Sequence, residues 1–434
     1  MRFFSKILAF LLLFVFVSCS NVENVNHEAE EIHDEVVNEF LPDYIISEKS
    51  VIDEFTEKVR QNADANSIVF MQITDTHVGG LSMSLALGTQ HIDMACYLST
   101  ACNCSFLIHT GDAIHGYEEG AESAEDSWSA LISKVGDYSI PFLFAEGNYV
   151  HDMGYKGELT RKKVQDYVCG LIKDVKADAV YNENDINSYY YFDDNTIGCR
   201  FFILDSQDYG DSRLKYGFSD QQVSFIAKAL DDAYEKELPV VFFAHMPPVA
   251  ELFAEGYDYG MKSNGKKMVD AIGDFSSKGG NVLAYIYGHD HWDNYYYDNQ
   301  NRIPYICMIN DFPSTYAINK PSLWGNPIRY PRSKKGIIQY AMDAYVINSN
   351  TKGIKVFRFG AGVNRYINVE PLIVKAGDTA TLTTELEGVV QWHSDDERIA
   401  LCNGGVIEGV AYGTALVTAQ DEKGNFEFFN VTCL

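Results

Sequence analysis

Residues 68–77 read Ile-Val-Phe-Met-Gln-Ile-Thr-Asp-Thr-His, an apolar run that ends in two potential metal ligands, Asp75 and His77. A run of this length and composition predicts a strand that is buried on both faces. Four further apolar runs also end in polar segments, which contain Asp112, Asn148, His245 and His289. Open α/β sheets place their sites at the carboxyl ends of strands. The pattern therefore predicts an α/β fold in which these segments meet.

The rest of the chain supplies helices and a second, all-β region. Residues 220–235 carry apolar side chains at helical spacing between two of the predicted strands. Residues 337–347 and 354–359 are typical of a closing hairpin, and the glycines of residues 360–362 mark a domain boundary. From residue 366 onward the sequence has short alternating segments and glycine turns. We therefore expect a small all-β domain at residues 366–434.

Composition narrows the class of protein. A chain of 434 residues is too long for one ordinary core and predicts two domains with accessory segments. The net charge of −27 argues against a nucleic-acid duplex as a partner, because binding to a phosphate backbone needs clustered Lys and Arg. The one basic cluster of the mature chain is expected on a solvated loop and comprises Arg329, Arg332, Lys334 and Lys335.

The first 19 residues have the pattern of an export signal. Arg2 and Lys6 flank an apolar run over residues 7–17 that is too short to span a bilayer comfortably. The run ends in a segment that resembles a bacterial lipobox, which would make Cys19 a lipid anchor. Plain secretion with cleavage nearby is the alternative. We expect an exported protein, an outer-membrane or cell-surface lipoprotein of a bacterium, with a periplasmic or secreted location as the alternative.

The segment after the signal is acidic. Residues 20–66 predict a solvated tether followed by a helix near residues 52–59. The chain has nine cysteines, and an even number remains besides Cys19. An exported protein with an even number of cysteines can form disulfides, but their pairing does not follow from one sequence.

The polar segments have the composition of a metal site. Asp75 and His77 alternate, so at a strand end both side chains can face one cavity, and His289 and His291 repeat this spacing. Asp112 follows a glycine and is the candidate bridging carboxylate. Mixed nitrogen and oxygen ligands suit Mn, Fe or Zn. We expect two such divalent or transition metal ions.

This ordered set of segments resembles the calcineurin-like metallophosphoesterase superfamily, whose motifs are Asp-x-His, Gly-Asp, Gly-Asn-His, a lone His and Gly-His-x-His. The resemblance implies one metal held by Asp75, His77, Asp112 and His291. It implies a second metal held by Asp112, Asn148, His245 and His289. It also implies a four-layer α/β/β/α sandwich over residues 67–362.

The third motif departs from the family pattern. The family follows its Asn with a His that assists the leaving group, but here the chain reads Asn148-Tyr149-Val150-His151-Asp152. Either Tyr149 replaces that His, or two inserted residues leave its role to His151. We favour the insertion, because it keeps the His-Asp pair. His115 is a further imidazole near the site that could compensate or bind a ligand carboxylate.

These residues predict an exported phosphoesterase that hydrolyses a phosphomonoester or a phosphodiester by attack of a metal-bridging hydroxide, with Asp112 and His151 as catalytic residues. One alternative is a nucleotide or nucleotide-sugar pyrophosphohydrolase. The other is a non-catalytic surface lipoprotein that binds a phosphorylated or glycan ligand. Trp292 and the tyrosines of residues 295–297 could line the mouth of the site, although hairpin packing is favoured.

The C-terminal region resembles the bacterial immunoglobulin-like group 2 module. The resemblance lies in residues 374–378, 390–394 and 405–415, and it implies that Trp392 fills the core of a small sandwich. Its implied role is spacing or contact with a glycan or protein at the cell surface.

Overall fold

The computed structural model describes residues 41–115, 123–149, 178–182, 189–208, 217–248, 264–313, 316–319, 328–348, 350 and 353–434. The chain divides into two compact units, residues 1–51 and 52–434. The predicted signal, lipid anchor and tether at residues 1–40 lie outside the described residues. Within the described residues, no helix is both long and apolar enough to cross a membrane.

Two helices open the described chain. Helix α3 spans Asp43–Ile46, and helix α4 spans Lys49–Gln61 and includes the helix predicted near residues 52–59. In the second unit, α4 buries Phe55, whose ring meets that of Phe359 edge-on at 5.3 Å between centroids. The apolar stripe of α4 is therefore part of the core of the second unit.

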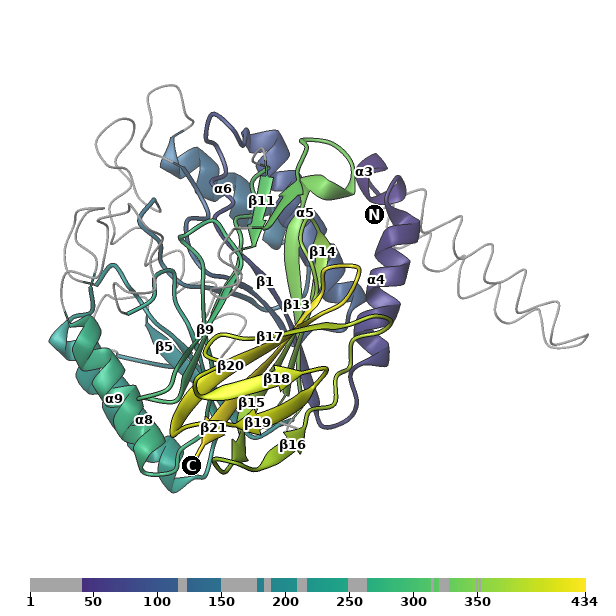
Figure 1. Ribbon diagram of the computed structural model, residues 1–434. Coiled ribbons are helices and arrows are strands. Elements are labelled where there is room, and N and C mark those ends of the chain that lie inside the picture. The colour runs from purple at the N-terminus through teal and green to yellow at the C-terminus, as the bar shows by residue number, and fades with distance from the viewer. Residues whose placement is uncertain are drawn as a thin grey trace, which may run out of the picture. The chain divides into compact units, whose positions relative to one another are not determined.

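The first large sheet has nine strands and includes the strand that opens with Ser67 (Figure 1). Its strands, in spatial order, are β17 (Gln391–Ser394), β20 (Gly413–Gln420), β21 (Phe426–Cys433), β15 (Arg365–Val374), β14 (Gly353–Gly360), β13 (Ala341–Asn348), β1 (Ser67–Ile73), β2 (Phe106–His109) and β3 (Phe142–Phe144). Strands β1, β2 and β3 run parallel, and β13 pairs with β1 in the antiparallel sense. The carboxyl ends of three predicted strands thus meet at one edge.

The second large sheet has seven strands. In spatial order they are β4 (Val180–Tyr181), β5 (Tyr190–Asp194), β6 (Cys199–Ile203), β7 (Val240–Phe243), β8 (Val282–Tyr287), β10 (Ile303–Cys307) and β9 (Asn294–Asp298). The two sheets contact through aromatic rings: Phe70 of β1 lies 5.4 Å from Phe243 of β7, and Phe106 of β2 lies 5.5 Å from Phe201 of β6. Such ring contacts stabilise a buried interface between the sheets.

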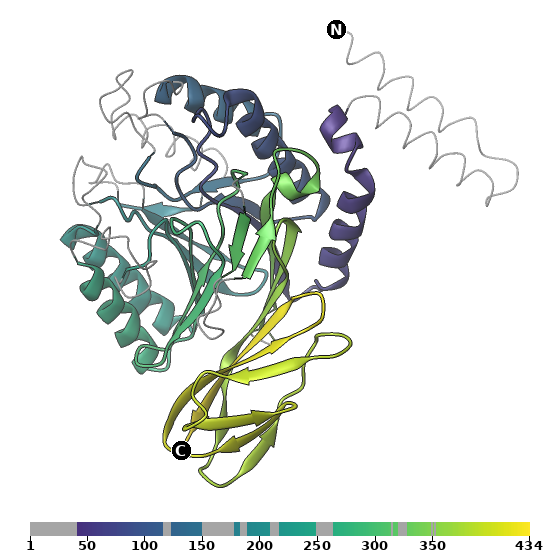
Figure 2. The same ribbon diagram turned by 45° about the horizontal axis from the view of Figure 1, so that its top comes forward.

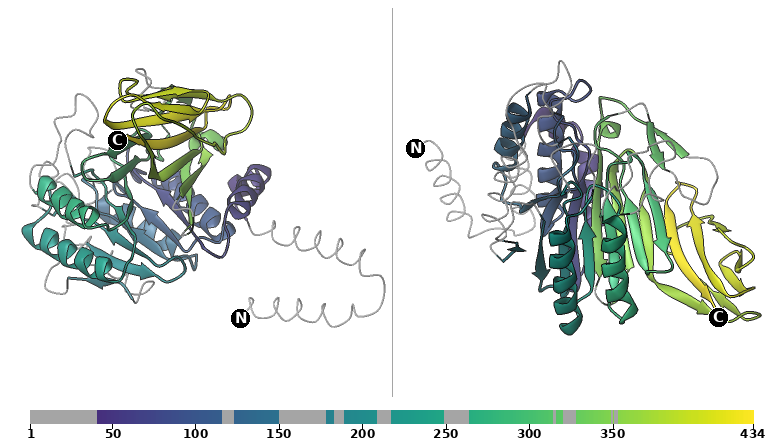
Figure 3. Two further views of the ribbon diagram at one scale, coloured as in Figure 1. Left: turned by 60° about the horizontal axis from the view of Figure 1, so that its bottom comes forward. Right: turned by 90° about the vertical axis from the view of Figure 1, so that its left-hand side faces the viewer.

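Four helices pack against these sheets. Helices α8 (Asp220–Glu235) and α9 (Gly265–Ser277) lie side by side and share an apolar cluster with strands of the second sheet (Figure 3). Helix α5 (Leu85–Ala101) contacts β1 and β2, and α6 (Ala124–Val135) places Trp128 5.1 Å from Phe144 of β3. The predicted mixed α/β character is confirmed, and the complete four-layer stacking stays a prediction.

The C-terminal strands continue the first sheet (Figure 2). Strand β15 pairs with β14 on one side and with β21 on the other. A separate three-stranded sheet contains β16 (Thr379–Thr381), β19 (Val406–Gly409) and β18 (Ala400–Asn403). Trp392 is partly buried and stacks on Phe429 at 5.7 Å. The all-β character expected here is therefore present, while the immunoglobulin-like identity stays a prediction.

The closing hairpin begins later than the sequence suggested. Residues Ile337–Gln339 form a 3-10 turn, η2, and the strand starts at Ala341. Gly360 follows with a φ of 96°, where a Cβ would lie only 2.1 Å from the carbonyl oxygen of Tyr340. Two segments of the backbone approach each other too closely here for any residue other than glycine. A further short pair, β11 (Tyr316–Asn319) with β12 (Ile328–Pro331), completes the described strands.

A buried cluster of four charged residues joins β15 to the segment that follows β8. Arg358 binds both Asp293 and Asp343, and Arg365 of β15 binds the same two carboxylates. All four side chains are at most 3% exposed. Removal of one partner from a buried ion pair leaves an uncompensated charge. The C-terminal strands are therefore tied electrostatically to the loop that carries two predicted metal ligands.

Candidate metal centre

The structure brings all seven predicted metal ligands together. One group contains Asp75, His77 and His291, and a second contains Asp112, His245 and His289. Within each group, the potential ligand atoms all lie within 4.8 Å of one another. Asn148 joins the second group, since its Oδ1 lies 3.1 Å from Nε2 of His245. This division is the one that the motif resemblance implied.

The local backbone differs from the strand-end alternation that the sequence suggested. Strand β1 ends at Ile73, so Asp75 and His77 lie on the loop beyond it, both with left-handed φ values of 50° and 48°. Thr76 between them turns to Nε2 of His109, 2.9 Å away, and donates to the carbonyl of Ala113. Alternating left-handed residues, not strand pleating, therefore direct both ligands to one side.

Left-handed backbone recurs through the centre. The described residues include nine non-glycine residues with positive φ, of which five are predicted ligands. The other three ligands of this kind have φ values of 52° at Asp112, 70° at His289 and 58° at His291. Each such residue costs on the order of 1–3 kcal/mol and persists where surrounding contacts enforce it. Strain concentrated at one place is typical of a functional site.

The motif glycines permit close approach around these ligands. A Cβ on Gly288 would lie 2.0 Å from Oγ1 of Thr74 and 2.6 Å from Oδ2 of Asp75. A Cβ on Gly147 would lie 2.3 Å from Oδ1 of Asp112, and one on Gly111 would lie 2.3 Å from Nδ1 of a facing histidine. No side chain fits these positions without displacing a ligand. The glycines therefore set the spacing of the ligand loops.

The spacing of the ligand atoms fits metal ions. Nε2 of His291 lies 3.2 Å from Oδ1 of Asp75, and Nε2 of His245 lies 3.2 Å from Oδ2 of Asp112. Nδ1 of His289 lies 3.2 Å from Nε2 of His245. A metal about 2.0–2.2 Å from each ligand atom holds those atoms roughly 3–4 Å apart. The donor set is nitrogen and oxygen alone, as expected for Mn, Fe or Zn.

One buried nitrogen supports this fit. Nε2 of His77 is buried and has no hydrogen-bond partner among the described residues. It lies 3.9 Å from Oδ1 of Asp75 and 3.9 Å from Oδ2 of Asp112. A buried polar atom without a partner is costly unless a ligand satisfies it. A metal ion between this nitrogen and the two carboxylates would do so.

The charges at the centre require a cation. Burial alone would raise the pKa values of Asp75 and Asp112, but the surrounding imidazoles outweigh it and hold both pKa values below their usual range. Burial lowers the pKa values of His77 and His289 to about 3 each, so both rings are neutral. Burial would also lower the pKa of His245, yet the two carboxylates raise it to about 9. A metal ion that displaced the proton of His245 would supply positive charge to the two carboxylates in its place.

The residues next to the ligands explain part of the altered third motif. The backbone N–H of Tyr149 donates to Oδ1 of Asp112 over 2.8 Å. Its ring meets His77 edge-on at 5.0 Å and stacks on His115 at 4.9 Å. Tyr149 thus occupies the position directly after the ligand Asn, whereas His151 lies outside the described residues.

His115 is placed differently from the sequence expectation. Its Nδ1 lies 2.9 Å from Nδ1 of His77. The ring therefore contacts a ligand imidazole, where we expected a ligand carboxylate. A hydrogen bond to the second ring nitrogen of a metal-binding histidine fixes the orientation of the ring.

The tyrosine cluster after His291 packs in a hairpin, as favoured from the sequence. Tyr295 is buried in β9 and stacks on Phe428 of β21 at 4.6 Å. Trp292 is partly buried against the cluster beneath α8 and α9. Phe312 instead lies at the centre, with its ring 5.4 Å from His77 and 5.2 Å from His291. No sequence pattern indicated this position, since Phe312 belongs to no motif.

Arg332 contradicts the expectation of a solvated basic loop. Only 8% of it is exposed, and its guanidinium donates to the backbone carbonyls of Asn310, Asp311, Phe312 and Gln339. An arginine fork can satisfy several carbonyls at once because its donors are fixed in one plane. Arg332 therefore holds the loop that carries Phe312.

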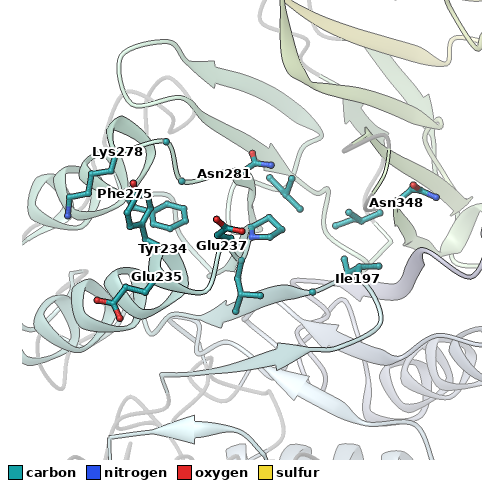
Figure 4. A pocket seen from close by; sticks show the side chains of 15 residues that line it. Ile197, Tyr234, Glu235, Glu237, Phe275, Lys278, Asn281 and Asn348 are labelled. Atoms are coloured by element: carbon teal, nitrogen blue, oxygen red, sulfur yellow. The ribbon is translucent and has the colours of Figure 1, made fainter.

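A separate open cleft of about 730 Å³ lies away from the metal centre (Figure 4). Its lining includes Leu238, Pro239 and Asn281, which directly precede β7 and β8, whereas the ligands His245 and His289 follow these strands. The cleft therefore opens at the amino ends of the strands and shares no residue with the predicted ligand set.

The chain is similar to a known protein family and to solved structures. Residues 68–293 match the family model described as calcineurin-like phosphoesterase. A dimetal phosphatase from Danio rerio has a similar fold, with 13% identity, a TM-score of 0.52, and coverage of 70% of this chain and 99% of that chain. GAP50, the anchor in the inner membrane complex of Plasmodium, has 14% identity, a TM-score of 0.41, and coverage of 67% and 83%. No curated protein is significantly similar to the chain.

Proposed function

This chain belongs to the calcineurin-like phosphoesterase family, and we propose that it hydrolyses a phosphomonoester or a phosphodiester outside the cytoplasm. It is a binuclear metal-dependent phosphoric ester hydrolase. The observation that carries the proposal is the position of Asp112. Its Oδ2 lies 3.2 Å from Nε2 of His245 in one ligand group and 3.9 Å from Nε2 of His77 in the other. One carboxylate therefore faces both groups, as a bridging ligand must.

We assign the ligands in two sets that share this carboxylate. Asp75, His77 and His291 complete the first set with Asp112, and Asn148, His245 and His289 complete the second with Asp112. Two metal ions bound there would supply Lewis acidity and lower the pKa of a water at the site. The same set of nitrogen and oxygen ligands suits Mn, Fe and Zn.

Charge at the centre supports a phosphate ester as substrate. Asp75 and Asp112 carry two negative charges, which neutralise only part of the charge of two divalent ions, so roughly two positive charges remain by formal counting. The surface of the chain is strongly acidic, with a net charge of −27. A local positive centre in an acidic protein attracts phosphate groups to that centre and not to the rest of the surface.

The proton for the leaving group needs a donor close to Asn148. We propose His151 in this role, since the segment after Asn148 retains a His-Asp pair two positions later than the family pattern. Tyr149 is the alternative donor, because it directly follows Asn148 and contacts His77. In either case, the side chain that donates the proton must reach the oxygen of the leaving group.

The N-terminal sequence supports export and a lipid anchor at Cys19. We propose residues 1–19 as a lipoprotein signal, residues 67–362 as the catalytic domain, and residues 366–434 as an immunoglobulin-like module for surface contact. Metabolic labelling with a radioactive fatty acid tests the anchor. We expect label on the wild type and none on a Cys19→Ala variant. Equal label on both proteins would contradict the proposal.

A panel of esters tests the reaction. The purified protein, loaded with Mn or Zn, is assayed on p-nitrophenyl phosphate, bis-p-nitrophenyl phosphate, nucleotides and nucleotide sugars. Turnover of the first two classes supports phosphoesterase activity. Cleavage confined to the P–O–P bonds of nucleotides and nucleotide sugars favours the pyrophosphohydrolase. Asp112→Asn should abolish turnover, whereas Asp270→Asn, an exposed carboxylate on α9, should leave it unchanged. Stoichiometric metal without turnover of any ester would contradict the proposed reaction.

A further inference from the structure

We propose that the rings of Phe312 and Tyr149 select the substrate of this centre, which is a phosphate ester whose esterified group carries a planar ring. The inference deepens the proposed phosphoesterase function and rests on it. Both rings belong to residues outside the predicted ligand set. Both residues are half-buried.

The two rings converge on one ligand imidazole. The Phe312 ring meets His77 at 5.4 Å with an interplanar angle of 80°, and the Tyr149 ring meets it at 5.0 Å and 86°. Phe312 also lies 5.2 Å from His291, whose side chain is 38% exposed. The apolar surface is therefore adjacent to the proposed first metal position. A phosphate bound there places its esterified group within reach of these rings.

The loop that presents Phe312 is held from several sides. Arg332 donates to the carbonyl oxygens of Asn310, Asp311 and Phe312 over 2.6, 3.0 and 2.8 Å. Asp311 binds Nδ1 of His91 through one carboxylate oxygen and accepts the backbone N–H of Ala341 through the other. These partners are buried, so the backbone that carries the ring is held in place before any ligand arrives. Preorganisation of this kind reduces the entropy lost on binding.

Chemistry decides what such a surface recognises. Aromatic rings gain most from contact with another planar apolar group, by offset or edge-to-face packing. A flexible sugar or a short alkyl group would cover the rings less well. A nucleoside phosphate and an aryl phosphate both carry a planar group, so they share the chemistry that the site selects. A nucleobase lies farther from its phosphate, which makes the two sources distinguishable.

Calorimetry with non-hydrolysable phosphonates tests the inference on the metal-loaded, full-length protein. Phenylphosphonate and methylphosphonate share the phosphonate group and differ in the planar ring. We expect phenylphosphonate to bind about tenfold more tightly. Phe312→Leu and Tyr149→Leu should each reduce this ratio to about twofold, while the affinity for methylphosphonate changes little. Tyr234→Leu is the control, since Tyr234 lines the distant cleft and is 44% exposed.

Two outcomes would overturn the inference: a ratio near one in the wild type, or an unchanged ratio in both aromatic variants. A second comparison, AMP against ribose 5-phosphate, distinguishes the sources. A preference for AMP supports a nucleobase, and a preference confined to phenylphosphonate supports an aryl group. If selective phosphonate binding occurs without turnover of any ester, the proposed function fails and the aromatic selection stands.

Discussion

Nδ1 of His115 lies 2.9 Å from Nδ1 of His77. A histidine outside the predicted ligand set therefore contacts the second ring nitrogen of a predicted ligand. Only one of the two nitrogens can donate a proton in this contact. If His77 donates from Nδ1, its Nε2 keeps a lone pair directed at Asp75 and Asp112. In that tautomer His77 can bind a metal through Nε2 while His115 orients its ring.

Removal of the His115 side chain should weaken the binding of one metal ion. His115→Ala is expected to reduce the affinity for one of the two metal ions by about 10- to 100-fold, because His77 loses the partner that orients its ring. Competition with a chromophoric chelator measures both affinities. His393→Ala, which changes a histidine of β17 in the C-terminal region, is the control. Two unchanged metal affinities in His115→Ala would contradict the role of this contact.

The C-terminal strands should be needed for stability of the second unit. Arg365→Met is expected to lower the free energy of unfolding by about 3–5 kcal/mol, because it leaves two buried carboxylates with one arginine. Urea unfolding followed by circular dichroism measures the change. Arg398→Met removes an exposed ion pair with Asp396 and should have no measurable effect. Equal losses in both variants would show that the buried cluster contributes nothing special.

Metal loading should release a proton from His245. The pKa of this group is raised from 6.5 to about 9 in the metal-free fold by the nearby carboxylates, in spite of its burial. A raised pKa means that the protonated ring stabilises the metal-free fold fully below pH 6.5 and loses this effect as the pH rises through 9. Because a metal ion competes with this proton, metal affinity should increase with pH up to about 9 and level off above that pH.

Calorimetry in buffers of different ionisation enthalpy counts the released protons. At a pH well below 9, the wild type should release one proton more per loading than His245→Asn, and this difference should vanish as the pH rises above 9. His77 and His289, whose pKa values are about 3, should contribute none. Identical proton release by the two proteins would rule out this account of the charge at the centre.

Two variants decide between the proposed proton donors. His151→Ala should reduce kcat by about 10²–10⁴-fold if this imidazole protonates the leaving group. Tyr149→Phe should have a small effect, since it keeps both the ring and the backbone N–H that binds Asp112. The comparison is made on an ester with a poor leaving group, where proton transfer matters most. A larger loss in Tyr149→Phe would assign the role to the phenol.

Much of this centre was predictable because buried parallel strands leave a strong sequence pattern. The apolar run of residues 68–73 is buried throughout β1, and its ligands follow it as expected. The strand that ends before His245 behaves in the same way. Polar residues after such runs must lie at the strand ends, so their proximity could be predicted without knowledge of side-chain packing.

Other features depend on tertiary contacts that no local pattern carries. Asp75 has a left-handed backbone, and its side chain lies against Gly288, more than two hundred residues away in sequence. Arg332 looked like part of a solvated basic cluster, yet its partners are carbonyls of residues 310–312 and 339. Phe312 has a role only because that loop meets His77. Such positions are set by the fold as a whole.

Metal reconstitution tests the central claim most directly. The purified protein is stripped with a chelator and titrated with Mn, while bound metal and hydrolysis of p-nitrophenyl phosphate are measured on the same samples. We predict two metal ions per chain, with activity that rises chiefly with the second, because Asp112 faces both ligand groups. Saturation at one ion, or full occupancy by two ions without hydrolysis of any ester, would contradict a binuclear phosphoesterase.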